Sequence, residues 1–474
     1  MAPAPWDSVS PDKTTFVLVT GANSGIGFGI CQRLIDEFIA TRSLDCHLIL
    51  IPTARSTRKS DDTVNALRRY AATRAECSKT LKSRLGPGYE ASETTRRIHI
   101  VSIQLDLCNL PSIKGASDQL VNGTLSNPSH TDAVQSLVDI RIPRLDAVIL
   151  NAGIGGWSGL NWSKVAHCFF SKGIVQATTF PTFKAGIKGL TVNPIPETSK
   201  SNDDDSKTSP VLGEVFCANV FGHYLFVHAI LPLLSREPGA TVPPGRIIWE
   251  SSIEPTGGDF SPSDFQAVKT KDAYESSKRL TDILAMTSSL PSVKPYSASY
   301  LSPPPSSKDG NLLTPPKIYL AHPGVVVSTL FPLNAFLFFW YRVVMYLSRW
   351  LGSPWHPVTA YNGACAMVWL ALAGEDELAS RGGQNVKWGT SCDRCGNTSP
   401  KKTEVEGWGW EGKVEDRAAL ANDDATGLLR KMVGRKADAV DLTEEKRAEF
   451  EELGVECWRE MERLRAEWEE RAGM

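Results

Sequence analysis

Residues 14–38, TTFVLVTGANSGIGFGICQRLIDEF, join a short apolar run to a glycine-rich turn and then to apolar residues at helical spacing. The run Phe16 to Val19 has the β-branched, apolar composition of a buried parallel strand. Glycines between a strand and a helix let the backbone approach a pyrophosphate, whose charge meets the helix N-terminus. The spacing here is G-x-x-x-G-x-G rather than G-x-G-x-x-G. In its strand–turn–helix context, the stretch predicts a dinucleotide-binding unit.

The remainder of the chain repeats the alternation of strand and helix. Strands are expected at 44–56, 98–107, 145–151, 246–252 and 318–322, and helices at 61–84, 219–234 and from 274 onward. Such alternation predicts an α/β fold, namely a Rossmann-type doubly wound parallel sheet in one large domain.

Segments that do not fit a minimal sheet are interpreted as additions to this domain. We expect the domain to cover 14–440, with insertions at about 155–213 and 289–316, and a charged helical appendage with few apolar anchors at 441–474. The first insertion reads as long and irregular with a polar, disordered tip, and the second as a Pro/Ser-rich loop.

The bulk composition excludes some classes of function. The chain has 474 residues, 42% of them hydrophobic, and a net charge of −2 without a long basic block, so nucleic acid is not an expected partner. The N-terminus is polar and lacks an apolar signal segment, and the 10 cysteines are irregularly spaced, so we expect reduced thiols. Cys392 and Cys395 form an isolated C-x-x-C, which leaves zinc as a weak alternative to the expected absence of metal.

Tyr274 and Lys278 lie in DAYESSKRLTDIL (272–284), one helical turn apart. On a helix they share one face, so the lysine should favour the phenolate and lower the tyrosine pKa toward the working range. Such a phenol can serve as a proton donor or acceptor. Taken alone, the spacing is equally compatible with an ordinary surface pair.

Arg55 stands where the second strand ends, a position at which an acidic residue would bind the ribose hydroxyls of NAD. An arginine can instead pair with a 2′-phosphate, and Arg58 and Lys59 follow closely. NADPH is therefore the expected cofactor. The alternative is a solvated basic loop.

Together these motifs resemble the short-chain dehydrogenase/reductase family, over about 14–371. The resemblance implies a catalytic asparagine at Asn219 beside Tyr274 and Lys278. It also implies the following cofactor-binding residues: Gly21, Ser24, Gly25, Ile26 and Gly27 in TGANSGIG, Arg55, Asp106 in QLDL, Asn151 in N-A-G, Tyr274, Lys278, Val325 in HPGV, and Ser328.

The family's catalytic serine is harder to place. Ser252 ends the fifth predicted strand, but a longer segment than usual separates it from Tyr274. Ser261 has the usual separation and lies within the inserted segment, whereas Ser251 should point to the other face of the strand. We select Ser252, because position at the strand end fixes geometry better than residue count, and Ser251 and Ser261 stay open as alternatives.

Finer details look like the sterol 3-ketoreductases of ergosterol synthesis. These are IIWESSIEP, AHPGVVVSTL, the lengthened serine–tyrosine segment and the stretch 387–412. The resemblance implies NADPH-dependent reduction of a 3-keto sterol to the 3-hydroxy sterol during C-4 demethylation. Ser252 would bind the ketone oxygen, Tyr274 would donate the proton, Lys278 would hold the nicotinamide ribose, and Asn219 would support a water. The alternatives are another lipophilic carbonyl, such as a retinal-like aldehyde or long-chain ketone, and a non-catalytic NADPH-binding scaffold for sterol enzymes.

Residues 330–351 are apolar and aromatic and follow the cofactor loop directly. Their length approaches that of a membrane span, but a proline and two arginines suit an interfacial helix better. We expect a hydrophobic lid that dips into a membrane surface to admit sterol, with a buried core helix as the alternative. The resemblance places the protein on the cytosolic face of the endoplasmic reticulum membrane or on lipid droplets, near other sterol-biosynthesis enzymes.

Overall fold

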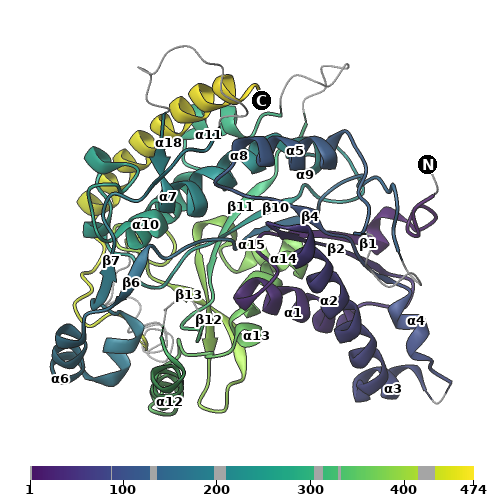
Figure 1. The fold of residues 1–474 in the computed structure, drawn as a ribbon, viewed down its shortest axis with the longest axis horizontal. Coiled ribbons are helices and arrows are strands. Elements are labelled where there is room, and N and C mark those ends of the chain that lie inside the picture. Colours follow the sequence, from purple (N-terminus) through teal and green to yellow (C-terminus); the bar gives the residue numbers. More distant parts are fainter. Residues whose placement is uncertain are drawn as a thin grey trace.

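The computed structural model describes residues 3–86, 88–128, 136–196, 210–303, 313–328, 333–414 and 433–474. A nine-stranded sheet with helices on both faces forms its centre (Figure 1). Its strand order is β3-β2-β1-β5-β10-β11-β12-β13, with β4 also paired to β2, and all pairs are parallel except β12 with β13. The order reverses between β1 and β5, where Rossmann-type sheets bind their ligands. The predicted doubly wound parallel sheet is confirmed.

The strands of this sheet are β1 (Thr14–Val19), β2 (His47–Ala54), β3 (Ile98–Ile100), β4 (Ile103–Gln104), β5 (Ala147–Leu150), β10 (Arg246–Glu250), β11 (Lys317–His322), β12 (Lys387–Cys392) and β13 (Thr398–Thr403). The strand predicted at 98–107 is interrupted: β3 pairs with the first half of β2, and β4 with its end. Strand β12 was not predicted, because its residues are all buried but half of them are polar.

Two sets of helices cover the sheet. α1 (Gly25–Thr41), α2 (Thr57–Cys77) and α14 (Cys365–Leu372) pack on one face, and α5 (Leu110–Val121), α8 (Gly222–Ala229) and α10 (Ala273–Thr287) pack on the other. The other helices discussed below are α6 (Trp162–Thr179), α11 (Lys294–Tyr300), α12 (Ala335–Trp350) and α18 (Glu444–Ala472); short ones are α3 (Lys79–Leu85), α4 (Ala91–Thr95), α7 (Glu214–Phe216), α9 (Leu231–Leu234), α13 (Ala360–Gly363) and α15 (Glu375–Ser380).

The C-terminal helix α18 belongs to the hydrophobic core. It lies against α10 and α11, and its inner face buries Phe450, Gly454, Cys457, Trp458, Met461, Leu464 and Trp468. The predicted helix is confirmed, but the expectation of few apolar anchors is wrong. The anchors recur every three or four residues, so they form one face, and the charged residues between them hide the pattern in the sequence.

Both predicted insertions contain regular structure. The first folds as β6 (Trp157–Leu160), α6 and β7 (Lys184–Gly186), followed by β8 (Thr191–Val192), which pairs with β9 (Leu212–Gly213); the expectation of an irregular segment is wrong there, and its polar tip lies outside the described residues. The second contains α11, whose Tyr300 is buried and stacks on Tyr224 with ring centroids 3.9 Å apart. Tertiary packing therefore outweighs the local turn-forming composition.

Candidate active site

Tyr274 and Lys278 lie on one face of the first turns of α10, at the carboxyl end of the sheet. Only 5% of Lys278 is exposed, and its ammonium donates to the backbone carbonyl of Glu250 at 2.7 Å. The same ammonium lies 5.7 Å from the centroid of the Tyr274 ring. The predicted shared face is confirmed, and the reading of an ordinary surface pair is wrong because the lysine is buried.

The electrostatic prediction for this pair needs correction. Burial raises the pKa of Tyr274 well above its usual value, and the carboxylate of Glu254 raises this pKa further, while a hydrogen bond with Ser252 opposes the change. Burial also lowers the pKa of Lys278. The expected lowering of the tyrosine pKa is therefore wrong, because desolvation and nearby carboxylates outweigh an ammonium that is bound to a carbonyl.

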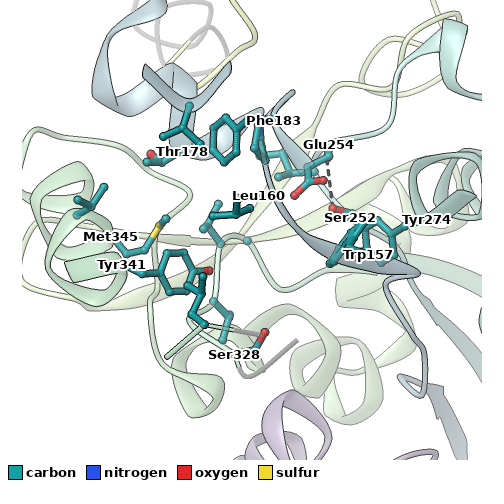
Figure 2. A pocket seen from close by; sticks show the side chains of 18 of the residues that line it. Trp157, Leu160, Thr178, Phe183, Ser252, Glu254, Tyr274, Ser328, Tyr341 and Met345 are labelled. Atoms are coloured by element: carbon teal, nitrogen blue, oxygen red, sulfur yellow. Dashed lines mark hydrogen bonds between the residues drawn. The ribbon is translucent and has the colours of Figure 1, made fainter. Parts of the chain in front are cut away.

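Of the three candidate serines, Ser252 is the one beside the tyrosine. Ser252 and Tyr274 line the same pocket, and the Ser252 hydroxyl accepts from the backbone N–H of Glu254 at 3.3 Å (Figure 2). The hydroxyl of Ser251 instead donates to the Asp282 carboxylate at 2.5 Å. Ser261 is exposed and hydrogen-bonds to the neighbouring Ser263. This geometry favours Ser252 for contact with a substrate oxygen.

Asn219 lies in a π-helical turn, Cys217–Phe221, that leads into α8. Its side-chain amide donates to the carbonyl of Ile154 and to the hydroxyl of Ser277, both at 3.0 Å, and its carbonyl accepts from the N–H of Ile154 at 2.8 Å. The hydroxyl of Ser277 in turn donates to the backbone carbonyl of Tyr274 at 2.7 Å. Asn219 therefore ties the segment after β5 to the first turn of α10.

The glycine turn has the geometry that a bound dinucleotide requires. Gly21 and Gly25 have φ of 64° and 55°, in the region that favours glycine. A Cβ on Gly27 would lie 2.5 Å from both the Asn151 amide nitrogen and the Gly21 carbonyl oxygen. Asn151 donates to the Thr20 carbonyl at 2.8 Å, which fixes the turn against β5. The tight packing leaves backbone, rather than side chains, facing the pyrophosphate position.

A cavity of about 330 Å³ lies at the start of α1, where Ser24 is the N-cap residue but makes no capping side-chain bond. The residues around it are Asn23, Ser24, Gly25, Phe28, Lys59, Asp62, Thr63 and Ala66. Since the helix N-terminus and Lys59 both favour an anion, these residues fit the phosphates of a nicotinamide dinucleotide.

The remaining predicted cofactor residues lie at the same edge of the sheet. Arg55 is exposed and directly follows β2, with Arg58 exposed nearby. Asp106 follows β4, and its carboxylate accepts from the Cys108 N–H at 3.0 Å. Val325 and Ser328 follow β11, and with Ile26 and Tyr274 they line a second pocket, separate from the cavity that Lys59 lines.

This second pocket has a volume of about 280 Å³ and is predominantly apolar. Ser252 and Tyr274 lie at one end, and side chains of the first insertion and of α12 form much of its wall (Figure 2). The contributors from the insertion are Trp157, Leu160, Trp162, Val165, Phe169, Thr178, Pro181 and Phe183. These residues were not predicted from the sequence, although the aromatic composition of the segment was a usable signal.

Helix α12 is an amphipathic wall of this pocket. Leu337, Tyr341, Val344 and Met345 face inward, whereas Phe336 and Phe339 are 71% and 58% exposed. The alternative of a buried core helix is therefore wrong; residues 330–332 of the predicted lid lie outside the described residues. In the described ranges, no helix combines the length and hydropathy needed to cross a membrane.

The isolated C-x-x-C lies at the β12–β13 turn, with Cys392 buried and Cys395 exposed. Within the part of the chain that the structure describes, no three His, Cys, Asp or Glu side chains gather as a metal site would require.

The strand order, the glycine turn and the Ser252–Tyr274–Lys278 arrangement together define a short-chain dehydrogenase/reductase. No family model matches the chain. It is 48% identical to the 3-keto-steroid reductase of Gibberella zeae over 473 residues, covering 100% of this chain and 98% of that protein. It is 40% identical to the 3-keto-steroid reductase of Aspergillus fumigatus over 467 residues, covering 96% and 94%. The chain belongs to the family of 3-keto-steroid reductases.

Solved structures give only a weak likeness. A 3-oxoacyl-[acyl-carrier protein] reductase from Brucella melitensis in complex with NAD is 13% identical with a TM-score of 0.36, covering 75% of this chain and 89% of that one. Salutaridine reductase from Papaver somniferum is 15% identical with a TM-score of 0.33, covering 67% and 88%. The assignment of the fold rests on the observed strand order instead.

Proposed function

We propose that the protein reduces the C3 ketone of a 3-keto sterol to the 3-hydroxy sterol, with NADPH as hydride donor, during C-4 demethylation in ergosterol biosynthesis. The observation that carries this proposal is the apolar pocket of about 280 Å³ with Ser252 and Tyr274 at one end. A rigid hydrocarbon substrate with a single polar oxygen suits such a pocket, because apolar walls bind its body and a few polar groups orient its oxygen. The identity to 3-keto-steroid reductases supports the same substrate class.

The side chains at the end of the pocket suit reduction of a ketone. Bound NADPH would supply a hydride to the carbonyl carbon. The hydroxyl of Ser252 hydrogen-bonds the carbonyl oxygen, and Tyr274 donates a proton to it. Because burial keeps the pKa of Tyr274 above its usual value, the phenol is protonated at neutral pH and ready to act as the acid.

Other residues hold the cofactor and the catalytic groups in place. The turn from Gly21 to Gly27 would hold the pyrophosphate of bound NADPH, Asp106 would lie on the adenine side, and Val325 and Ser328 would lie on the nicotinamide side. Lys278 would hold the nicotinamide ribose. Asn219 positions the first turn of α10 through Ser277.

The experiment that tests this function is NADPH oxidation by the purified protein with a panel of carbonyl compounds. We expect turnover of 3-keto sterols, analysed as 3-hydroxy sterols, and little turnover of retinal or long-chain ketones. A protein that binds NADPH without consuming it in the presence of any panel member would instead be a scaffold.

Arg55 should select NADPH over NADH. It is exposed at the end of β2, where its guanidinium is free to approach a 2′-phosphate. Arg55→Ala should weaken NADPH binding by about 1.5–3 kcal/mol, the range for a charge-assisted contact, and leave NADH binding nearly unchanged. Fluorescence titration with the two cofactors measures both affinities.

Arg69→Ala is the matched control, since Arg69 is an exposed arginine farther along α2. If Arg55→Ala lowers both affinities equally, Arg55 does not select the cofactor. Arg58→Ala and Lys59→Ala would then be the next variants, because Arg58 is exposed nearby and Lys59 lines the cavity beside the glycine turn.

We further propose that α12 rests on a membrane surface and admits sterol to the pocket, on the cytosolic face of the endoplasmic reticulum or on lipid droplets. Its outer face exposes Phe336, Phe339 and Trp350, and its inner residues line the pocket. Trp340 lies at the boundary, because it is half exposed and also lines the pocket. Aromatic side chains favour the membrane interface, and sterol dissolved in lipid would reach the pocket along this helix. Binding to these membranes would also bring the protein close to other sterol-biosynthesis enzymes.

Replacing Phe336 and Phe339 with serine should weaken binding to phosphatidylcholine liposomes. Each ring that enters the lipid should contribute on the order of 1.5–3 kcal/mol. Liposome co-flotation measures the change. Val440→Ser is the control, since Val440 is 61% exposed outside α12. Unchanged co-flotation of the Phe336/Phe339 variant would exclude α12 as the membrane contact.

A further inference from the structure

Lys184, from the first insertion, lies in a buried cluster of charges beside Tyr274. It begins β7, and only 5% of its side chain is exposed. Its ammonium pairs with the carboxylates of Glu254 and Glu275, the latter at 2.7 Å. The backbone is held closely here, because a Cβ on Gly186 would lie 1.7 Å from the Lys271 carbonyl oxygen. Both the ion pairs and the backbone therefore fix the position of this lysine.

The same ammonium lies against the ring of Tyr274. It is 4.9 Å from the centroid of that ring and 4.3 Å from the centroid of the Trp157 ring. Trp157 meets Tyr274 edge-on, with ring centroids 4.7 Å apart (Figure 2). Lys184 is thus closer to the tyrosine ring than Lys278, which lies 5.7 Å away. Both distances are within the range at which a cation interacts with an aromatic ring.

We propose that Lys184 is a positioning residue of the reaction: held by Glu254 and Glu275, it places a positive charge against Tyr274 and stabilises the tyrosinate left after proton transfer. This inference rests on the proposed function. In the reduction, the O–H bond of Tyr274 breaks and a new O–H bond forms on the C3 oxygen, while the hydride from the nicotinamide forms the C–H bond. The tyrosine then carries the negative charge until it is reprotonated. A cation at the ring lowers the free energy of that state more than that of the neutral phenol.

Several other groups face Tyr274, and their charges set the expected direction of any change. They are Glu254 after β10, Glu275 and Lys278 on α10, and Glu250 at the end of β10, with Asp259 and Tyr341 acting through Glu254. Burial opposes the charge on Lys184, but Glu254 and Glu275 raise its pKa, so the ammonium stays charged. The cluster contains one ammonium, from Lys184, and two carboxylates, from Glu254 and Glu275. Removing a carboxylate should lower the pKa of Tyr274, and removing the ammonium should raise it.

The test is a ¹⁹F NMR titration with fluorotyrosine in place of Tyr274, since ring fluorines bring the phenol pKa into the range in which the protein is folded. The parent is compared with Glu254→Gln, Glu275→Gln and Lys184→Met, and with Lys188→Met as an exposed control. A unit charge about 5 Å away, at an effective dielectric constant of about 20, shifts a pKa by about two units. We expect the midpoint of the phenol titration to fall by at least about one pH unit in Glu254→Gln and by less in Glu275→Gln. In Lys184→Met the midpoint should rise.

If the phenol midpoints of all variants equal that of the parent, the cluster is only structural and the proposal is overturned. A Lys184→Met variant that folds and keeps the phenol midpoint of the parent overturns the proposal, whatever the two glutamine variants do. If Lys184→Met does not fold, Lys184→Gln takes its place: a raised midpoint supports the proposal and an unchanged one overturns it. The titration needs neither cofactor nor sterol. Failure of the proposed function would appear separately, as a wild-type protein that does not consume NADPH with any 3-keto sterol.

Discussion

Tyr274→Phe should lose at least ~100-fold in the turnover of a 3-keto sterol, by the range for general acid catalysis. The variant keeps the ring that packs against Trp157 but lacks the hydroxyl beside Ser252 in the pocket. NADPH affinity should stay near that of the parent, because Lys278 and the glycine turn are untouched. Single-turnover kinetics with prebound NADPH would measure the chemical step.

The control is Tyr296→Phe on α11, which removes a hydroxyl from a partly buried tyrosine outside the pocket. That variant should turn over sterol as the parent does. If Tyr274→Phe retained turnover within about tenfold of the parent, below the range expected for loss of the proton donor, Tyr274 would not be the acid.

Trp458→Ala should destabilise the protein by about 3–5 kcal/mol, the range for truncating a buried large aromatic residue. Trp458 is 1% exposed, its indole donates to the carbonyl of Leu284 at 3.2 Å, and its ring centroid lies 5.6 Å from that of Tyr300. The truncation would leave a cavity where α18 meets α10 and α11. Urea unfolding followed by fluorescence would measure the loss of stability.

Arg459→Ala, one residue later on the exposed side of α18, should change stability by no more than about 0.5 kcal/mol. A loss of less than about 1 kcal/mol in Trp458→Ala would mean that α18 is an appendage without a part in the core.

The central sheet and the cofactor end of the site could be predicted from sequence because short-range patterns specify them. The segment 14–38 contains strand, glycine turn and helix without interruption, and the observed β1 and α1 follow it closely. Tyr274 and Lys278 depend only on helical geometry, so their shared face was also predictable. Strand β12, which lies between β11 and β13, was not, because half of its buried residues are polar and its parallel partner β11 is distant in sequence.

The substrate end of the site depends on long-range contacts that local patterns do not report. The segment 155–196 carries many glycines and polar residues, yet it forms β6, α6 and β7 and brings Trp157 and Lys184 to Tyr274. The pKa of Tyr274 was mispredicted for the same reason. Spacing revealed the nearby ammonium of Lys278, whereas burial and the carboxylate of Glu254 became visible only in three dimensions.

Transfer of deuteride from NADPH labelled at C4 of the nicotinamide is the most direct measurement of the proposed chemistry. Mass spectrometry of the product should find one deuterium at C3 of a 3-hydroxy sterol with the parent protein, and strongly reduced labelling with Tyr274→Phe. An unlabelled sterol recovered from parent protein that binds NADPH, or label found only in the alcohol from retinal or a long-chain ketone, would contradict sterol 3-ketone reduction.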